Sequence, residues 1–219
     1  MKKVTLTLIT AALFGAVSLP SQAQEYMFTY SKLYTHMKQN ANEGHEDVKV
    51  GFFFLNAETK KLCQIEKAWM EKEEHYEELS ISDYQEVLVP LDDNLRSANP
   101  LVFIDTPENQ RCDFSMVVMT KEPLAGKVTY QQVEALLPQM QSILEELGGM
   151  FASWFTPNVE GVTLEFADNL NSVVVLSDGK QKQIVDGKVQ IALSEIGEDG
   201  YMTLPQPTAR VLPYLPKAD

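Results

Sequence analysis

Two cysteines, Cys63 and Cys112, impose the strongest single constraint on how this chain can fold. They do not form a C-x-x-C pair, the close spacing that redox-active dithiols commonly use. In an exported chain, an even number of cysteines predicts a structural disulfide. Closing a loop of about 50 residues stabilises a fold by roughly 4 kcal/mol in the chain-entropy model. The sequence therefore predicts one covalent link between two distant segments.

The first 23 residues predict the export on which this argument depends. Two lysines precede an uncharged apolar run, residues 4–19, and the small residues Ser21 and Ala23 stand where signal peptidase reads the chain. We expect cleavage between Ala23 and Gln24 and a periplasmic mature chain. A membrane anchor is the alternative, but the run is shorter than the roughly 20 residues of a spanning helix. We expect no later segment to span a membrane as a helix.

The net charge of the chain limits the classes of partner that it can bind. Its 18 basic and 31 acidic residues give a net charge of −13. Loss of the two leader lysines leaves 16 basic residues, so the mature charge is −15. A field of this sign repels phosphate backbones and anionic lipid heads, which argues against nucleic acid and membrane surfaces. A cationic ligand or an envelope protein is the better match.

Two segments carry the three-and-four periodicity of helices. Within residues 26–40, it predicts a short amphipathic helix with one apolar face, made by Met27, Tyr30, Leu33, Tyr34 and Met37. An aromatic stripe that grips a ligand is the functional interpretation of that face. A helix docked on a sheet is the simpler one, and we favour it.

The stronger helix covers residues 129–149. Thr129 and Gln132 form a capping-box pattern, Gly148-Gly149 is a stop signal, and Pro138 predicts a kink or a split into two helices. The apolar face consists of Val133, Leu136, Leu137, Met140, Ile143, Leu144 and Leu147, and it continues through Phe151, Trp154 and Phe155. We expect this face to cover a sheet rather than to bind a partner in a groove.

Strand patterns flank this helix on both sides. Residues 48–55 are expected to pair as a hairpin with a return strand that places Cys63, Ile65 and Trp69 on one face. Helix propensity competes within residues 64–78, where we favour strand. ELSI, EVLVPL and CDFSMVVMT are further expected strands, and DDNLRSANP carries turn residues.

From residue 162 onward, short strands alternate with tight turns at Asp178-Gly179 and Asp186-Gly187. A proline-rich tail follows, which is expected to lie extended along the fold. The predicted fold class is α+β, with antiparallel β units, a central helical segment and one disulfide. Its parts are a signal peptide (1–23), a disulfide-bridged α+β part (24–128), a helical segment (129–157) and a small antiparallel β unit (158–219). All of the mature chain could equally form one domain.

Familiar catalytic signatures are missing from the sequence. There is no G-x-S-x-G, no H-E-x-x-H, no P-loop, no G-x-G-x-x-G after a strand and no EF-hand loop. The three histidines are not paired at a zinc-binding spacing. We therefore predict no catalytic residue, no metal ligand and no cofactor.

EKEEHYEE, residues 71–78, is the densest cluster of ionisable side chains. Neighbouring glutamates on a strand or helix point in different directions, so few of them can reach one ion. We favour a solvated charged surface. The alternative is a carboxylate- or metal-dependent periplasmic hydrolase, whose site would combine Glu71, Glu73, Glu74 or His75 with a distant Asp105 or Asp113.

Several segments resemble a known family. They are EYMFTYSKLY, KLCQIEKAWMEKEEHYEEL, SANPLVF, RCDFSMVVMTKEPLAGKV, GGMFASWFTP and LPQPTARVLP. On these segments the chain resembles the uncharacterised exported gammaproteobacterial family called domain of unknown function 2987, across nearly all of the mature chain. The resemblance implies an exported location and no assigned activity, and it supplies no functional residues.

The leading hypothesis is a soluble, non-catalytic periplasmic binding or envelope-assembly factor that uses an aromatic or helical surface. The sequence leaves open whether the protein is an enzyme, and it favours a protein that is not one. A stabilising subunit of a larger envelope complex is a third hypothesis, which a broad exposed apolar patch on residues 133–155 would favour.

The disulfide gives the first testable prediction. The exported protein, unfolded without reductant, is expected to leave a thiol reagent unconsumed, because both cysteines are oxidised. Reaction of two equivalents of the reagent under these conditions would contradict the prediction. The same sample after reduction is the control, and it should consume two equivalents.

Overall fold

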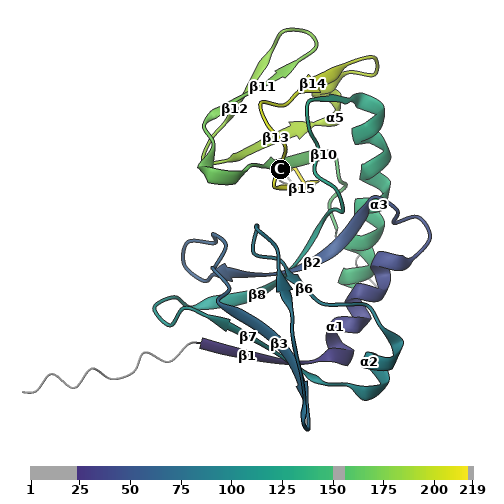
Figure 1. Cartoon of the computed structure of the whole chain (residues 1–219). Coiled ribbons are helices and arrows are strands. Elements are labelled where there is room, and N and C mark those ends of the chain that lie inside the picture. Colours follow the sequence, from purple (N-terminus) through teal and green to yellow (C-terminus); the bar gives the residue numbers. More distant parts are fainter. Residues whose placement is uncertain (1–23, 150–155, 217–219) are drawn as a thin grey trace, which may run out of the picture.

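The computed structural model describes residues 24–149 and 156–216 (Figure 1). The expected signal peptide and the predicted apolar extension at Phe151, Trp154 and Phe155 lie outside the described residues. Antiparallel sheets form two parts of the molecule, and one long helix runs alongside both of them (Figure 1). The fold is α+β, as the sequence predicts. Among the described residues, no helix is long and apolar enough to cross a membrane.

The N-terminal part, residues 24–120, contains a four-stranded sheet with strand order β1-β7-β3-β4, the two-stranded ladder β2-β8 and the small pair β5-β6. Its elements are β1 (Gln24–Thr29), α1 (Tyr30–Met37), η1 (Lys38–Ala41), β2 (Val48–Asn56), β3 (Lys67–Lys72), β4 (His75–Glu78), β5 (Ser80–Ile81), β6 (Val87–Leu88), α2 (Asp93–Ala98), β7 (Leu101–Thr106) and β8 (Cys112–Thr120).

Aromatic side chains hold the four-stranded sheet against the β2-β8 ladder. The Tyr26 ring lies 4.7 Å from the Phe54 ring, and the Phe28 ring lies 4.7 Å from the Phe114 ring, measured between centroids. Both pairs are tilted, an arrangement that aromatic rings prefer over a face-to-face sandwich. The inward alternation of Tyr26 and Phe28 explains why residues 24–29 form a strand.

The predicted disulfide is present between Cys63 and Cys112, with an S–S distance of 2.06 Å. Both cysteines are buried. Cys112 is the first residue of β8, and the Cys63 backbone N–H donates to the Phe54 carbonyl on β2. The bond therefore fixes the loop after β2 to one end of the β2-β8 ladder.

The C-terminal part contains two further antiparallel sheets, with strand orders β13-β10-β15 and β12-β11-β14-β9. The turn at Asp186-Gly187 has positive φ at both residues, 49° and 76°, the conformation of a tight hairpin turn. The elements are β9 (Lys127–Thr129), β10 (Gly161–Glu165), η2 (Ala167–Asn169), β11 (Ser172–Leu176), β12 (Gln181–Ile184), β13 (Lys188–Ala192), α5 (Leu193–Ile196), β14 (Tyr201–Thr203) and β15 (Arg210–Tyr214).

Helix α3 (Tyr130–Gly148) connects the two parts. Its N-terminus carries the predicted capping box of Thr129 and Gln132, and the helix continues through Pro138 as one element rather than two. It packs against β2 and β8 of the N-terminal part and against β9, β10, β15 and α5 of the C-terminal part. Its buried side chains belong to one continuous apolar cluster that includes residues of both parts.

The prediction of a helix over residues 26–40 was partly wrong. Strand β1 occupies residues 24–29, and helix α1 begins only at Tyr30. Tyr30, Leu33, Tyr34 and Met37 are buried as expected, whereas Met27 stands on the strand with 61% of its surface exposed. The helical spacing of Met27 is coincidental, because pairing with β7 determines its conformation.

The prediction that residues 48–55 pair as a hairpin with the segment after Cys63 was wrong, because each strand pairs with another partner. Strand β2 pairs with β8 along nine residue pairs, from Val48 with Thr120 to Asn56 with Cys112. Strand β3 instead pairs with β4 and β7. Strand is the correct state for this segment, but Ala68 and Met70 face the core in place of Trp69.

The segment predicted as a turn at residues 92–99 contains the short helix α2. Asp92 caps it by accepting hydrogen bonds from the Asn94 and Leu95 backbone N–H groups. The Tyr34 hydroxyl donates to the Asp93 carboxylate at 2.5 Å, which raises the pKa of Tyr34. A local cap and one tertiary contact therefore stabilise a helix too short to show periodicity.

The shared core predicts cooperative unfolding. Replacing Ile143, which is fully buried on α3, with alanine should lower the free energy of unfolding by about 2–5 kcal/mol. Because α3 packs on both parts, tryptophan fluorescence and far-ultraviolet circular dichroism should shift together in urea. Glu134→Ala on the exposed face is the matched control and should change little. Two separate transitions would contradict a common core.

Candidate functional site

The four-stranded sheet exposes one face to solvent, which we call the outer face. Strand register arranges its side chains in three rows that run across the strands. Glu25, Asp105 and Lys67 form the first row, Met27, Phe103, Trp69 and Glu78 the second, and Thr29, Leu101, Glu71 and Tyr76 the third. The outer face therefore has an apolar and aromatic middle row with charged neighbours.

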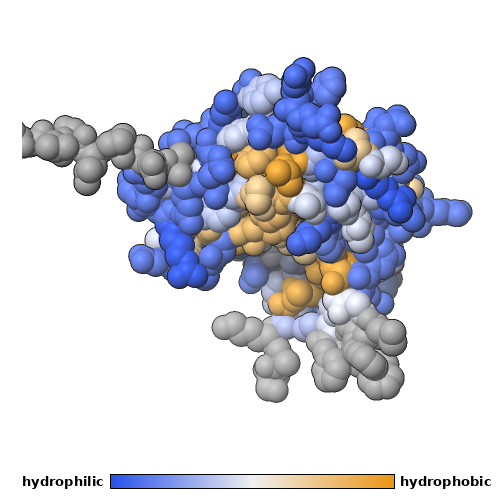
Figure 2. Space-filling model, turned by 90° about the horizontal axis from the view of Figure 1, so that it is seen from below, coloured by the Kyte–Doolittle hydropathy of each residue, from blue (hydrophilic) through white to orange (hydrophobic). Residues whose placement is uncertain are grey.

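Large apolar side chains are unusually exposed here. Met27 has 61% of its surface exposed and Tyr76 has 53%, two of the highest values among large hydrophobic residues in the described chain. Trp69 and Leu101 are half-buried. Figure 2 shows apolar surface gathered on the side of the molecule seen from below, where β1, β3 and β7 lie in Figure 1. Contiguous apolar surface of this kind commonly marks an interaction site.

Trp69 is held in one orientation by two neighbours. Its ring stacks on the Phe103 ring, with centroids 5.2 Å apart and an interplanar angle of 11°. Its indole Nε1 donates a hydrogen bond to the Glu71 carboxylate at 3.2 Å. A side chain fixed before binding loses less conformational entropy when a ligand arrives. The central ring of the outer face is therefore preorganised.

Lys67 places its ammonium group beside two rings of this face. Its Nζ lies 5.0 Å from the Trp69 ring centroid and 5.4 Å from the Tyr76 ring centroid, within the range of cation–π attraction. Interaction with Tyr76, and then with Glu78 and Asp105, raises the pKa of Lys67. This ammonium group is therefore positively charged at any physiological pH.

Carboxylates outnumber cations on the outer face. Glu25, Glu71, Glu78 and Asp105 stand in its rows, against Lys67. The excess of acids has the sign of the whole chain, whose net charge is −13. A positively charged partner is attracted to such a face over a distance of about a Debye length, roughly 8 Å at physiological salt.

The acids proposed for a hydrolase do not converge. Glu71 binds the Trp69 indole, Glu73 and Glu74 form the exposed turn between β3 and β4, and His75 is exposed at the start of β4. Asp105 lies two rows from Glu71 on the outer face. Asp113 is on β8, within ion-pair distance of Lys60 and Arg111. The described residues contain no group of three His, Cys, Asp or Glu able to hold a metal.

The apolar face of α3 is covered rather than exposed. Val133, Leu136, Met140 and Ile143 are buried, and Leu137, Leu144 and Leu147 pack against the core. Within the described part of residues 133–155, there is therefore no broad exposed patch for a partner. This favours the sheet over the helix as the interaction surface.

His45 is buried against α3, which its sequence position in a turn does not indicate. Its Nδ1 lies 2.8 Å from the Gln39 carbonyl oxygen, and its Nε2 lies 3.1 Å from the Ser142 hydroxyl. This pair has the separation of a nucleophile and its base. With only 2% of His45 exposed, its evident role is to join the 38–47 segment to the helix.

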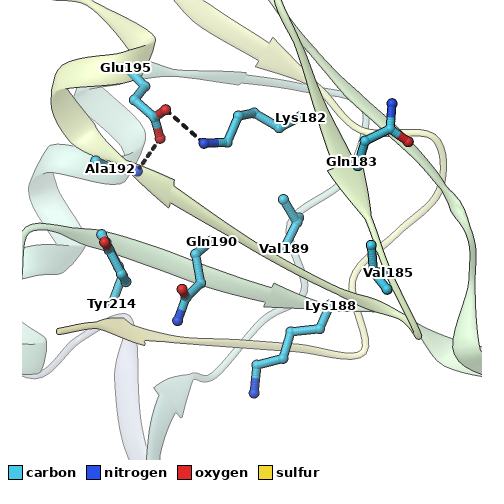
Figure 3. Close-up of a pocket in the computed structure, with 9 residues that line it drawn as sticks. All are labelled: Lys182, Gln183, Val185, Lys188, Val189, Gln190, Ala192, Glu195 and Tyr214. Atoms are coloured by element: carbon cyan, nitrogen blue, oxygen red, sulfur yellow. Dashed lines mark hydrogen bonds and ion pairs between the residues drawn. The ribbon is translucent and has the colours of Figure 1, made fainter. Parts of the chain in front are cut away.

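The C-terminal part has a cavity of about 680 Å³ between strands β12 and β13. Figure 3 shows that Lys182 and Glu195 point toward one another across one end of it, where they form an ion pair of 2.7 Å. The other polar lining residues are lysine, glutamine and tyrosine side chains. Among the described residues, no histidine, cysteine, serine or threonine lines this cavity, so none of them resembles an activated nucleophile.

A second cavity, of about 670 Å³, lies between the two parts of the molecule. Six of the residues that line it have positive φ, namely Lys60, Gln85, Asp168, Asn169, Asp186 and Gly187. Its charged groups largely balance, and Glu165 binds both Arg210 and Lys188. The cavity therefore shows no preference for a charge or a chemical class.

The sequence interpretation missed most of the outer face. It assigned Met27 to a helix and Trp69 to the strand face of Cys63 and Ile65, and it did not single out Phe103 or Tyr76. One signal was available: in KAWMEK both alternating faces carry a large apolar residue. A strand that is apolar on both faces either lies between two layers or exposes one face for binding.

The dispersed acids give a prediction about metals. Calcium or zinc at millimolar concentration should leave the melting temperature unchanged, because no group of carboxylates or imidazoles converges to bind an ion in the described part of the chain. Thermal denaturation with and without a chelator measures this. A rise that disappears when Glu71, Glu73, Glu74 and His75 are all replaced by alanine would reveal a metal site at this hairpin.

Comparison with known proteins adds one finding. No match is found among curated proteins or among solved structures. A family model described as "Protein of unknown function (DUF2987)" matches residues 22–166, which contain the disulfide, helix α3 and every residue of the outer face. Because this match covers about two thirds of the sequence, the chain belongs to the DUF2987 family.

Proposed function

We propose that this protein is an exported, non-catalytic binding or envelope-assembly factor that works in the periplasm and binds a basic segment of another protein through the outer face. One observation carries the proposal: the half-buried Trp69, held in place by stacking on the buried Phe103, lies among carboxylates and exposed apolar side chains on a four-stranded sheet. Aromatic side chains of this kind dominate the energetics of protein interfaces.

The N-terminal sequence supports export. Its charged start, apolar run and small residues before Gln24 are those of a cleaved signal peptide. Strand β1 begins at Gln24, so cleavage after Ala23 leaves every described element intact. The disulfide also suits an oxidising compartment such as the periplasm.

Charge and shape support a basic protein segment as the partner. The carboxylates of the outer face attract it, and the apolar middle row offers contact area once it has arrived. A hydrolase has less support, because the acids considered for it point apart and Glu71 is engaged with Trp69. Binding through the outer face requires no convergence of these acids.

A labelled peptide of alternating lysine and valine residues tests the proposal. Fluorescence anisotropy at physiological salt should show binding that Trp69→Ala weakens at least tenfold, the size of effect typical of an interface hot spot. Met27→Ala should also weaken binding. Because Met27 is 61% exposed, its loss leaves the core intact.

Val185→Ala is the matched control. Val185 is also 61% exposed, but it belongs to the C-terminal part, outside the four-stranded sheet. Its variant should bind the peptide as the native protein does. Equal affinities for all three variants, or no binding by the native protein, would contradict the proposal.

A further inference from the structure

The Lys67 side chain occupies a position on the outer face that a cationic side chain of a partner could also occupy. It is exposed, and its ammonium group rests beside the rings of Trp69 and Tyr76. We propose that these two rings form a subsite for a lysine or arginine side chain of the partner, and that Lys67 occupies this subsite until the partner displaces it. This inference rests on the proposed function and names its recognition chemistry.

The geometry of the subsite comes from strand register. Lys67 and Trp69 are two residues apart on β3 and therefore point to the same side of the sheet. Tyr76 stands on the neighbouring strand β4, opposite Glu71, and Glu78 stands opposite Trp69. One cation can therefore contact both rings from above the sheet.

The subsite has both features that recognition of a cation requires. The aromatic faces attract an ammonium or guanidinium group through their quadrupoles. The carboxylates of Glu78 and Asp105 interact favourably with the Lys67 ammonium that now lies there, and they would do the same for a cation that replaced it. The stacking on Phe103 and the hydrogen bond to Glu71 keep the Trp69 ring in place during the exchange.

Displacement of Lys67 is easy because the side chain is exposed and flexible. Its contact with the rings competes with the partner and weakens the binding of any incoming cation. Removing the Lys67 ammonium should therefore strengthen binding of the lysine–valine peptide by about two- to fivefold, the amount that an exposed cation–π contact supplies. A purely structural role for Lys67 predicts no such gain.

Lys67→Gln is the test variant, and Lys72→Gln is its control. Lys72 lies on the same strand and its loss changes the charge equally, but its ammonium donates to the Ala98 carbonyl. Peptide affinity should rise in Lys67→Gln beyond any rise in Lys72→Gln. The excess should vanish when Trp69→Leu is added to Lys67→Gln. Equal gains in both lysine variants, or a gain that survives Trp69→Leu, would overturn the subsite.

A second measurement separates this inference from the proposed function. The chain has two tryptophans, so the Trp154→Phe background leaves Trp69 as the sole indole reporter. Titration of N-acetyl-lysine methylamide into this background should change Trp69 fluorescence at lower concentration in Lys67→Gln than with Lys67 present. If the titrations differ in this way but the native protein does not bind the peptide, the subsite is supported and the proposed basic partner is ruled out. If Lys67→Gln and the protein that keeps Lys67 give identical titration curves, the subsite is ruled out, whether or not the peptide binds.

Discussion

The ladder between β2 and β8 is the interaction on which the rest of the structure depends. Its nine residue pairs form the longest strand pairing among the described residues. One side of the ladder supports the four-stranded sheet through Phe54 and Phe114. On the other side, Phe53 lies under the Arg210 guanidinium of the C-terminal part, 4.8 Å from ring centroid to Cζ. The disulfide at one end of the ladder, and the packing of helix α3 on both of its strands, then hold the ladder in place.

This arrangement explains how the outer face can be apolar and still stable. Its strands bury Val102, Ile104, Ala68 and Met70 against the ladder, so the sheet does not need its second face for the core. The outer face can therefore carry apolar side chains. Their contact with water is unfavourable, but it does not disturb the packing of the core. A rigid backbone beneath them keeps their rings and carboxylates at fixed spacings, as recognition of another molecule requires.

The local features of the fold were predictable from the sequence, and the long-range pairings were not. The capping box at Thr129 and the turn at Asp186-Gly187 depend on neighbouring residues, so their patterns are visible in the chain. The partner of β2 is separated from it by several other elements, and β-branched and aromatic residues fit either partner equally well. The outer face was missed for the same reason, because its rows exist only after β1, β3 and β7 have been brought side by side.

The order of the strands sets how the chain can be divided. Strand β9 lies before helix α3, yet it pairs with β14 near the end of the chain, and β10 pairs with β13 and β15. A gene fragment that stopped where the family match stops, at residue 166, would encode β9 and β10 without any of these partners. Recombination at that boundary would expose two unpaired strands together with the apolar side chains beneath them. Residues 1–166 alone are therefore not a self-contained folding unit, because two of their strands depend on partners that follow residue 166.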